Sequence, residues 1–259
     1  MKFYPGLDIK PTTNPMGFEY GEGCFGPVVE NRTLDSIRES LVDHNCTGPD
    51  PVYSIAMDVG KEIHKPFLIE HDLLFGVVTY SSGRLGNEPI RSQGHIHKKT
   101  RNNTMSPPEI YEIWSGKAII YMQESGDNNP GRCFAVEASS GEVVIVPPDW
   151  AHATISVDPD EPLTFGAWCD RNYGFEYDKV RAHNGLAWVP LYNKDGKIEW
   201  LHNRNYNHCE IIIKTPRNYQ SLGIIPEIPI YSIFEKDPET FLYVSNPIIK
   251  KEVWTNFTP

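Results

Sequence analysis

Three histidines and one glutamate between residues 95 and 152 have the residue types and the spacing of a metal site. His95 and His97 are two residues apart, so on a strand they project from the same face. Glu109 opens the next strand-like run, and His152 follows the string PPDWA after a valine-rich run. Three imidazoles and one carboxylate suit a divalent transition metal, with positions left open for two substrate oxygens. A His-x-His pair alone favours a solvated basic loop, but the glutamate and the later histidine reverse that preference.

The elements that must position these residues are short apolar runs that begin at Pro51. They are rich in β-branched and aromatic residues and are separated by Gly, Pro, Asp and Asn, which predicts an all-β sandwich or barrel over residues 51–186. Residues 1–50 are expected to form an extended arm and a short helix. Thr33 is the expected N-cap of that helix, which spans residues 34–44.

Residues 187–259 are expected to form a C-terminal β extension. A hairpin is predicted with its turn at Asp195-Gly196, and edge strands are predicted at residues 209–215 and 228–234. The last apolar stretch, residues 241–257, carries no group suited to a site. We expect it to cover a sheet face or to serve a subunit contact.

Composition limits the classes of partner. The formal net charge of −10 argues against a nucleic-acid-binding protein. No stretch approaches the length of a membrane span, and the first residues lack the apolar core of a signal peptide. The five cysteines are scattered and form no Cys-x-x-Cys pair, which favours free thiols in a reducing cytoplasm.

The metal-site residues resemble the two motifs of the cupin superfamily. In the first motif, a glycine follows the glutamate after a gap of six residues, as Gly116 follows Glu109 here. The stretch between His97 and Glu109 is longer than is usual in cupins and is expected to be a loop insertion. Glu112 is the competing ligand. The six-residue gap to Gly116 and the alternation of side chains along the strand both favour Glu109. The second motif is similar to Gly141, Pro147 and His152, with Asp149 in place of a common glycine and Ser156 in place of an asparagine.

A narrower resemblance covers roughly residues 50–200 and points to the cupin-type phosphoglucose isomerases. The strings QGHIH, EIYEIWSGKAIIYMQ and VVIVPPDWAHATI carry it. The resemblance implies an all-β cupin (jelly-roll) barrel with additional C-terminal strands, assembled as a homodimer. It implies interconversion of glucose 6-phosphate and fructose 6-phosphate with one divalent metal per chain. Iron is the expected metal, and manganese, nickel and zinc are the alternatives.

The resemblance also assigns roles to individual residues. His95, His97, Glu109 and His152 are the implied metal ligands, and Glu109 is also the implied proton carrier. Tyr111 lines the implied substrate pocket and is expected to be catalytic together with Glu109. The implied substrate-binding residues are Tyr53, Ser92, Gly94 and Tyr177. Thr79 is a weaker phosphate candidate, because Val78 stands where the family has a threonine. The basic run Lys98, Lys99 and Arg101 offers a cation to phosphate, with Lys98 preferred, or is a solvated charge run. Phe175 stands where the family has a histidine.

Two other classes of function stay open. The same three-histidine, one-glutamate set serves other cupin enzymes, which include isomerases or epimerases of a different sugar and iron-dependent dioxygenases. A non-catalytic sugar-binding module that keeps the metal as a structural element is the third class. The way the hydrogen moves also stays open, because a carboxylate bound to a dication is a poor base.

Overall fold

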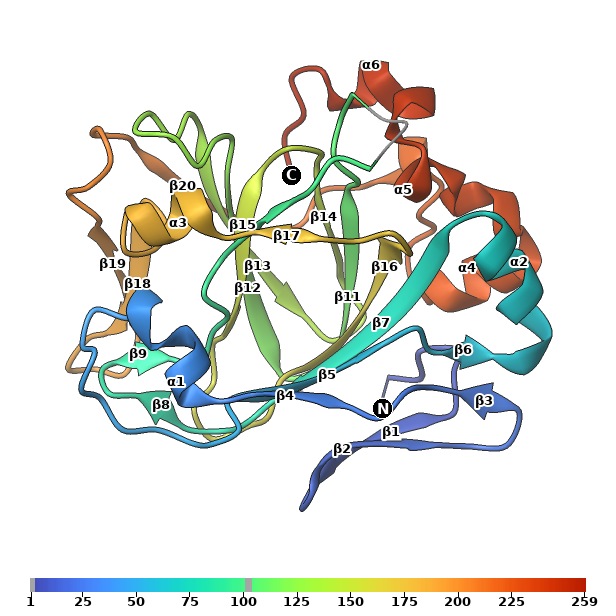
Figure 1. Ribbon diagram of the computed structural model, residues 1–259, viewed down its shortest axis with the longest axis horizontal. Helices are drawn as coiled ribbons and strands as arrows, with labels where there is room; N and C mark the ends of the chain where they lie inside the picture. The colour runs from blue at the N-terminus through green and yellow to red at the C-terminus, as the bar shows by residue number, and fades with distance from the viewer. Residues whose placement is uncertain (1–2, 101–103) are drawn as a thin grey trace.

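The computed structural model describes residues 3–100 and 104–259, so Arg101 of the basic run lies outside the described residues. Two β-sheets face each other around a shared core (Figure 1). The six-stranded sheet has the order β14 (Val143–Val146), β11 (Glu109–Ser115), β16 (Thr164–Asp170), β7 (Leu73–Tyr80), β5 (Tyr53–Met57) and β4 (Glu30–Arg32). The four-stranded sheet has the order β15 (Ala151–Ser156), β12 (Lys117–Gln123), β13 (Cys133–Ser139) and β20 (Ile211–Lys214). This architecture confirms the predicted all-β jelly-roll barrel.

Strand β11 shows how the alternation of side chains organises the molecule. Tyr111 and Ile113 face the core between the two sheets, whereas Ile110 and Trp114 belong to a second core on the outer face of the six-stranded sheet. Both faces of this sheet are therefore buried, as a sheet covered on both sides requires. Glu109 shares its face with Tyr111, and Glu112 shares the opposite face with Trp114.

Short helices near the C-terminus cover that outer face (Figure 1). They are η3 (Gln220–Leu222), α4 (Ile230–Lys236), η4 (Pro238–Phe241), α5 (Leu242–Ser245), η5 (Pro247–Lys250) and α6 (Lys251–Trp254). Phe241, Tyr243 and Trp254 pack in the same core as Trp168 of β16. The expectation that the last apolar stretch covers a sheet face is confirmed.

The strand predicted at residues 228–234 is wrong, because this segment forms α4. Its buried residues are Ile230, Tyr231, Ile233 and Phe234, the spacing of one helical face rather than of a strand. Pro229 is the N-cap, where a missing N–H group leaves no helical hydrogen bond unmade. The other C-terminal strands are confirmed: β18 (Trp188–Tyr192) and β19 (Ile198–His202) form the predicted hairpin, and β20 extends the four-stranded sheet.

The N-terminal segment is more structured than an extended arm. Strands β1 (Ile9–Thr13) and β2 (Met16–Tyr20) form a hairpin, and β3 (Cys24–Phe25) pairs with β6 (Gly60–Lys61). The Thr33 side chain caps α1 (Leu34–Ile37) by accepting from Ser36 N, as predicted, but the helix is shorter than expected and continues as η1 (Arg38–Ser40). Because β4 pairs with β5, this segment adds a strand to the edge of the six-stranded sheet.

The remaining elements are short and connect the sheets. They are η2 (Glu62–His64), α2 (Lys65–Glu70), β8 (Arg84–Leu85), β9 (Glu88–Pro89), β10 (Ile96–His97), β17 (Phe175–Glu176) and α3 (Asp178–Ala182). Among the described residues, no helix has the length and apolar character needed to cross a membrane.

Candidate metal centre and its cavity

The fold brings the three histidines and the glutamate together from separate elements. His95 forms a two-way backbone bridge with His152 of β15, with N–H to O distances of 3.1 and 2.9 Å. His97 ends β10, and Glu109 begins β11. One potential ligand atom from each of the four residues lies within 4.8 Å of all the others. This spacing allows one divalent ion to be bound between them, since such ions lie about 2.0–2.2 Å from nitrogen and oxygen ligands.

Backbone carbonyl groups orient two of the imidazoles. Nδ1 of His97 donates to Pro107 O at 3.1 Å, and Nδ1 of His152 donates to Trp150 O at the same distance. A carbonyl oxygen can only accept, so in both rings the proton is on Nδ1 and the lone pair is on Nε2. Both Nε2 atoms lie 3.1 Å from Oε2 of Glu109. Nε2 of His95 is buried and has no hydrogen-bond partner in the protein, which a metal ion would provide.

The protonation states also suit a metal. Burial, together with the nearby His152 and His97, holds the pKa of His95 well below its usual range. Burial also lowers the pKa of His152. Burial would raise the pKa of Glu109, but its close contacts with His152 and His97 outweigh that effect and hold the pKa well below its usual range. Two neutral imidazoles and an ionised carboxylate are the forms that bind a divalent ion.

Two further side chains hold the Glu109 carboxylate in place. The Tyr111 hydroxyl donates to Oε2 at 2.7 Å, and the Cys169 thiol donates to Oε1 at 3.4 Å. Burial raises the pKa of both donors, so both keep their protons at neutral pH. Cys169 carries no sequence signal of this role, because it is one residue in an apolar strand far from Glu109 in the chain.

Glu112, the competing ligand, points away from this group. Its Oε1 accepts from Ile230 N at 2.7 Å, and its Oε2 accepts from the Trp114 indole at 3.1 Å. The carboxyl group therefore meets the first turn of α4, on the outer face of the sheet.

A cavity opens into the barrel from the candidate metal-binding cluster of His95, His97, Glu109 and His152. Its lining includes His95, Glu109 and the predicted substrate-binding residues Tyr53, Ser92, Tyr111 and Tyr177, together with Arg32, Ile55, Met57, Val78, Tyr80, Gln93, Thr154, Phe165 and Phe175. The Phe175 ring lies 4.5 Å from the His95 ring and 5.6 Å from the His97 ring, measured between centroids. Phe175 thus places an apolar wall beside two of the candidate ligands.

Three of the sequence-predicted residues do not line this cavity. Thr79 faces away and shares a hydrogen bond of 3.0 Å with Thr164. Lys98 is exposed and lines separate hollows near Lys99. Gly94 has a φ of +91°, and a Cβ atom there would lie 2.8 Å from Leu186, so the backbone needs a glycine.

Comparison with known proteins places the chain in a family. The family model described as glucose-6-phosphate isomerase (GPI) matches residues 35–209. The chain belongs to the glucose-6-phosphate isomerase family. The resemblance to cupin-type phosphoglucose isomerases is therefore confirmed.

Curated relatives and solved structures match part of the chain. A glucose-6-phosphate isomerase of Thermococcus onnurineus is 32% identical over 58% of this chain and 74% of the relative. One of Thermococcus litoralis is 30% identical over 50% of this chain and 62% of the relative. One of Pyrococcus furiosus is 28% identical over 52% of this chain and 65% of the relative. This chain therefore spans less than two thirds of the length of the Thermococcus litoralis and Pyrococcus furiosus relatives. An oxalate oxidase structure matches 49% of this chain and 56% of its own with a TM-score of 0.37 and 15% identity.

The segment matched by the family contains the four candidate ligands but not the whole cavity. Arg32 precedes the first matched residue, and the helices from α4 onward follow the last. Arg32 is a cavity residue that motif analysis missed, since no spacing rule relates residue 32 to residues 95–152. A strand pairing brings it to the site.

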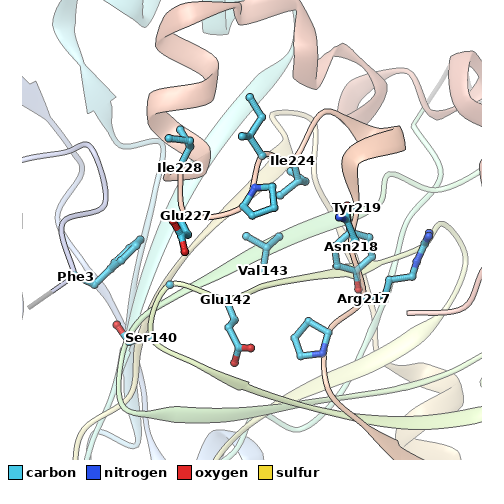
Figure 2. Close-up of a pocket in the computed structure, with 14 residues that line it drawn as sticks. Phe3, Ser140, Glu142, Val143, Arg217, Asn218, Tyr219, Ile224, Glu227 and Ile228 are labelled. Atoms are coloured by element: carbon cyan, nitrogen blue, oxygen red, sulfur yellow. The ribbon is translucent and has the colours of Figure 1, made fainter. Parts of the chain in front are cut away.

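A second cavity, of about 530 Å³, lies elsewhere and shares no described residue with the first. The turn before β14, the N-terminal Phe3 and residues 216–219 and 224–228 line it. Figure 2 shows Phe3 at one side and Arg217 at the other, with Val143 between them. It contains none of the four candidate metal ligands.

Proposed function

We propose that this protein is a metal-dependent aldose–ketose isomerase that interconverts glucose 6-phosphate and fructose 6-phosphate. Family membership supports the reaction class. The observation that carries the proposal is that the three-histidine, one-glutamate cluster opens into a cavity lined by hydroxyl groups and one guanidinium. Such a cavity offers a metal for the carbonyl end of a sugar and polar donors for its remaining oxygens.

The proposed cofactor is one divalent transition metal held by His95, His97, Glu109 and His152. Iron is the first candidate, and manganese, nickel and zinc are the alternatives, because all of them accept imidazole and carboxylate ligands. When bound, the ion would polarise the sugar carbonyl and stabilise negative charge on its oxygen.

Glu109 is the proposed proton carrier as well as a ligand. The reaction moves one hydrogen from C2 to C1 of the aldose while the carbonyl moves from C1 to C2. A carboxylate whose pKa lies well below its usual range is a weak base, so direct transfer of hydride between the two carbons competes with proton transfer. Substrate labelled with deuterium at C2 separates the routes: proton transfer predicts exchange with solvent, and direct transfer predicts retention.

The proposed substrate contacts follow the cavity lining. We place Tyr111 beside the sugar, and Tyr53, Ser92 and Tyr177 near the phosphate, with Gly94 two residues after Ser92 in the chain. The assignments of Thr79 and Lys98 to phosphate stay predictions that the cavity lining does not support.

A coupled assay of fructose 6-phosphate turnover tests the function. We expect turnover by the metal-loaded protein, its loss after chelation and its return when Fe, Mn, Ni or Zn is restored. Replacement of the exposed His44 by alanine is a matched control for the histidine ligands and should leave turnover unchanged. A protein that holds metal and shows no turnover with any of these ions would overturn the proposal.

A homodimer in a reducing cytoplasm is part of the same proposal. Strand β20 is at the edge of its sheet and exposes Ile212 and Ile213, and an exposed apolar edge strand favours pairing with a second chain. Light scattering should report a dimer that Ile213→Lys weakens. A wild-type monomer at micromolar concentration would contradict the dimer, and fractionation of cells would test the compartment.

A further inference from the structure

The cavity beside the metal-binding cluster has one permanent positive charge in its lining, at Arg32. Arg32 is the last residue of β4 and lies directly opposite Tyr53 in the antiparallel ladder of β4 and β5. Tyr53 lies opposite Tyr80 of β7 in turn, and the two rings stack at 4.7 Å. Directly opposite residues share a sheet face, so Arg32, Tyr53 and Tyr80 form one row along the cavity wall.

The electrostatic effect of Arg32 reaches several cavity groups. Of the described residues that line the cavity, Arg32 alone is a lysine or an arginine. Its charge opposes the rise that burial causes in the pKa of Tyr53 and of Tyr177. The cavity thus joins an anion-attracting guanidinium to a metal-binding cluster. A ligand with a carbonyl at one end and an anionic group at the other would satisfy both.

A nearby position of the same sheet, Val78 on β7, offers no polar donor to the cavity. Val78 lines the cavity, while the hydroxyl of the neighbouring Thr79 is directed to Thr164. This strand therefore presents no hydroxyl donor to the cavity at that position. A guanidinium carries several donors in a planar fork that matches phosphate oxygens, so Arg32 would supply what the strand lacks.

The present partner of Arg32 is easily exchanged. Its Nη1 lies 2.8 Å from Oε1 of Glu30, and the Glu30 side chain is 59% exposed. Ion pairs with an exposed partner contribute little to stability, so a phosphate dianion competes well with this carboxylate. The Arg32 side chain itself is 28% exposed, so solvent screens its interaction with a ligand in the cavity less than it would at an open surface.

We propose that Arg32 binds the phosphate group of the substrate and sets the preference for phosphorylated over unphosphorylated sugars. This inference rests on the proposed sugar-phosphate isomerase function. It goes beyond the family match, which begins after Arg32. Arg32 is a specificity residue at the non-reacting end of the substrate, so its loss should affect substrate binding more than the chemical step.

Steady-state kinetics with paired variants test the proposal. Arg32→Met should raise KM for fructose 6-phosphate about 10- to 100-fold, as expected for loss of a charged hydrogen bond, and should change kcat less than about threefold. Arg32→Lys should lie between wild type and Arg32→Met. Arg84→Met is the matched control, because Arg84 is an exposed guanidinium that stacks on Tyr192 at 4.1 Å, and it should leave KM unchanged.

Glu30→Gln separates phosphate binding from a structural role of the ion pair. If Arg32 binds phosphate, removal of the competing carboxylate should lower KM about twofold. If the ion pair serves only to hold β4 in place, Glu30→Gln should raise KM as Arg32→Met does, and that result would overturn the proposal. An unchanged KM in Arg32→Met would overturn it as well.

Binding measurements keep this inference distinct from the proposed function. Calorimetry with fructose 6-phosphate and with fructose should show that wild type prefers the phosphorylated sugar and that Arg32→Met loses this preference. If wild type shows this pattern without turnover, the isomerase proposal fails and the role of Arg32 stands. If wild type turns over substrate and Arg32→Met keeps the preference, the role of Arg32 fails and the isomerase proposal stands.

Discussion

Glu112→Gln should leave the metal centre intact and change how stability depends on pH. The Glu112 carboxyl is 1% exposed and accepts hydrogen bonds from Ile230 N and from the Trp114 indole. Burial raises the pKa of this group from 4.5 to about 8, although both hydrogen bonds oppose the rise. Glutamine keeps a carbonyl oxygen that can accept from Ile230 N, and it cannot ionise.

The sign and the size of the effect follow from linkage. Because the folded state holds the proton more tightly than the unfolded state, the contribution of Glu112 to stability is full below pH 4.5 and is lost as pH rises through about 8. With these two pKa values, the contribution of Glu112 to the unfolding free energy falls by about 3–4 kcal/mol between pH ~5 and pH ~8. The variant lacks this loss, so the stability of wild type relative to Glu112→Gln should fall by that amount over the same interval.

Urea unfolding at several pH values measures this difference. Asp170 is also buried, and burial raises its pKa to about 6, but it is present in both proteins and cancels in the comparison. Glu137→Gln on β13 is the matched control, because Glu137 is exposed and its replacement removes the same charge. A wild-type-minus-variant difference that is the same at pH ~5 and pH ~8 would refute the reasoning. Loss of bound metal in Glu112→Gln, with metal retained in Glu109→Gln, would refute the strand register.

Four further substitutions test the site and the core. His97→Ala and His152→Ala should each lose bound metal by elemental analysis and lower turnover more than about 100-fold with unchanged circular dichroism; full metal occupancy in either would exclude that residue as a ligand. Tyr111→Phe removes the donor to Glu109 Oε2 and should lower metal affinity or kcat about 10-fold, so wild-type values for both would show that the hydroxyl does not position the carboxylate. Trp168→Ala should lower the unfolding free energy by about 3–5 kcal/mol in urea, because the ring is fully buried against the C-terminal helices; a loss below about 1 kcal/mol would contradict that packing.

Strand alternation and motif spacing together predicted which residues lie close enough to form the candidate metal site. Residues two apart on a strand share a face, which predicts that His95 and His97 project together. The same rule puts Glu109 on the face of Tyr111 and Glu112 on the opposite face. The turn at Asp195-Gly196 and the Thr33 cap were predictable for the same reason, since short-range geometry determines both.

Other features depended on contacts between distant parts of the chain. The segment at residues 228–234 has β-like composition but forms α4, because burial of one helical face against the sheet outweighs local propensity. The position of Cys169 against Glu109 and of Arg32 in the cavity wall also follows from strand pairing across many residues.

The sequence by itself thus determined the fold class and which residues could bind a metal, because the first depends on periodicity within strands and the second on residue types and motif spacing. Only the tertiary structure decided which cation faces the cavity, which groups hold the glutamate and what covers the outer face of the sheet. These depend on which strands become neighbours, and local spacing does not encode that choice.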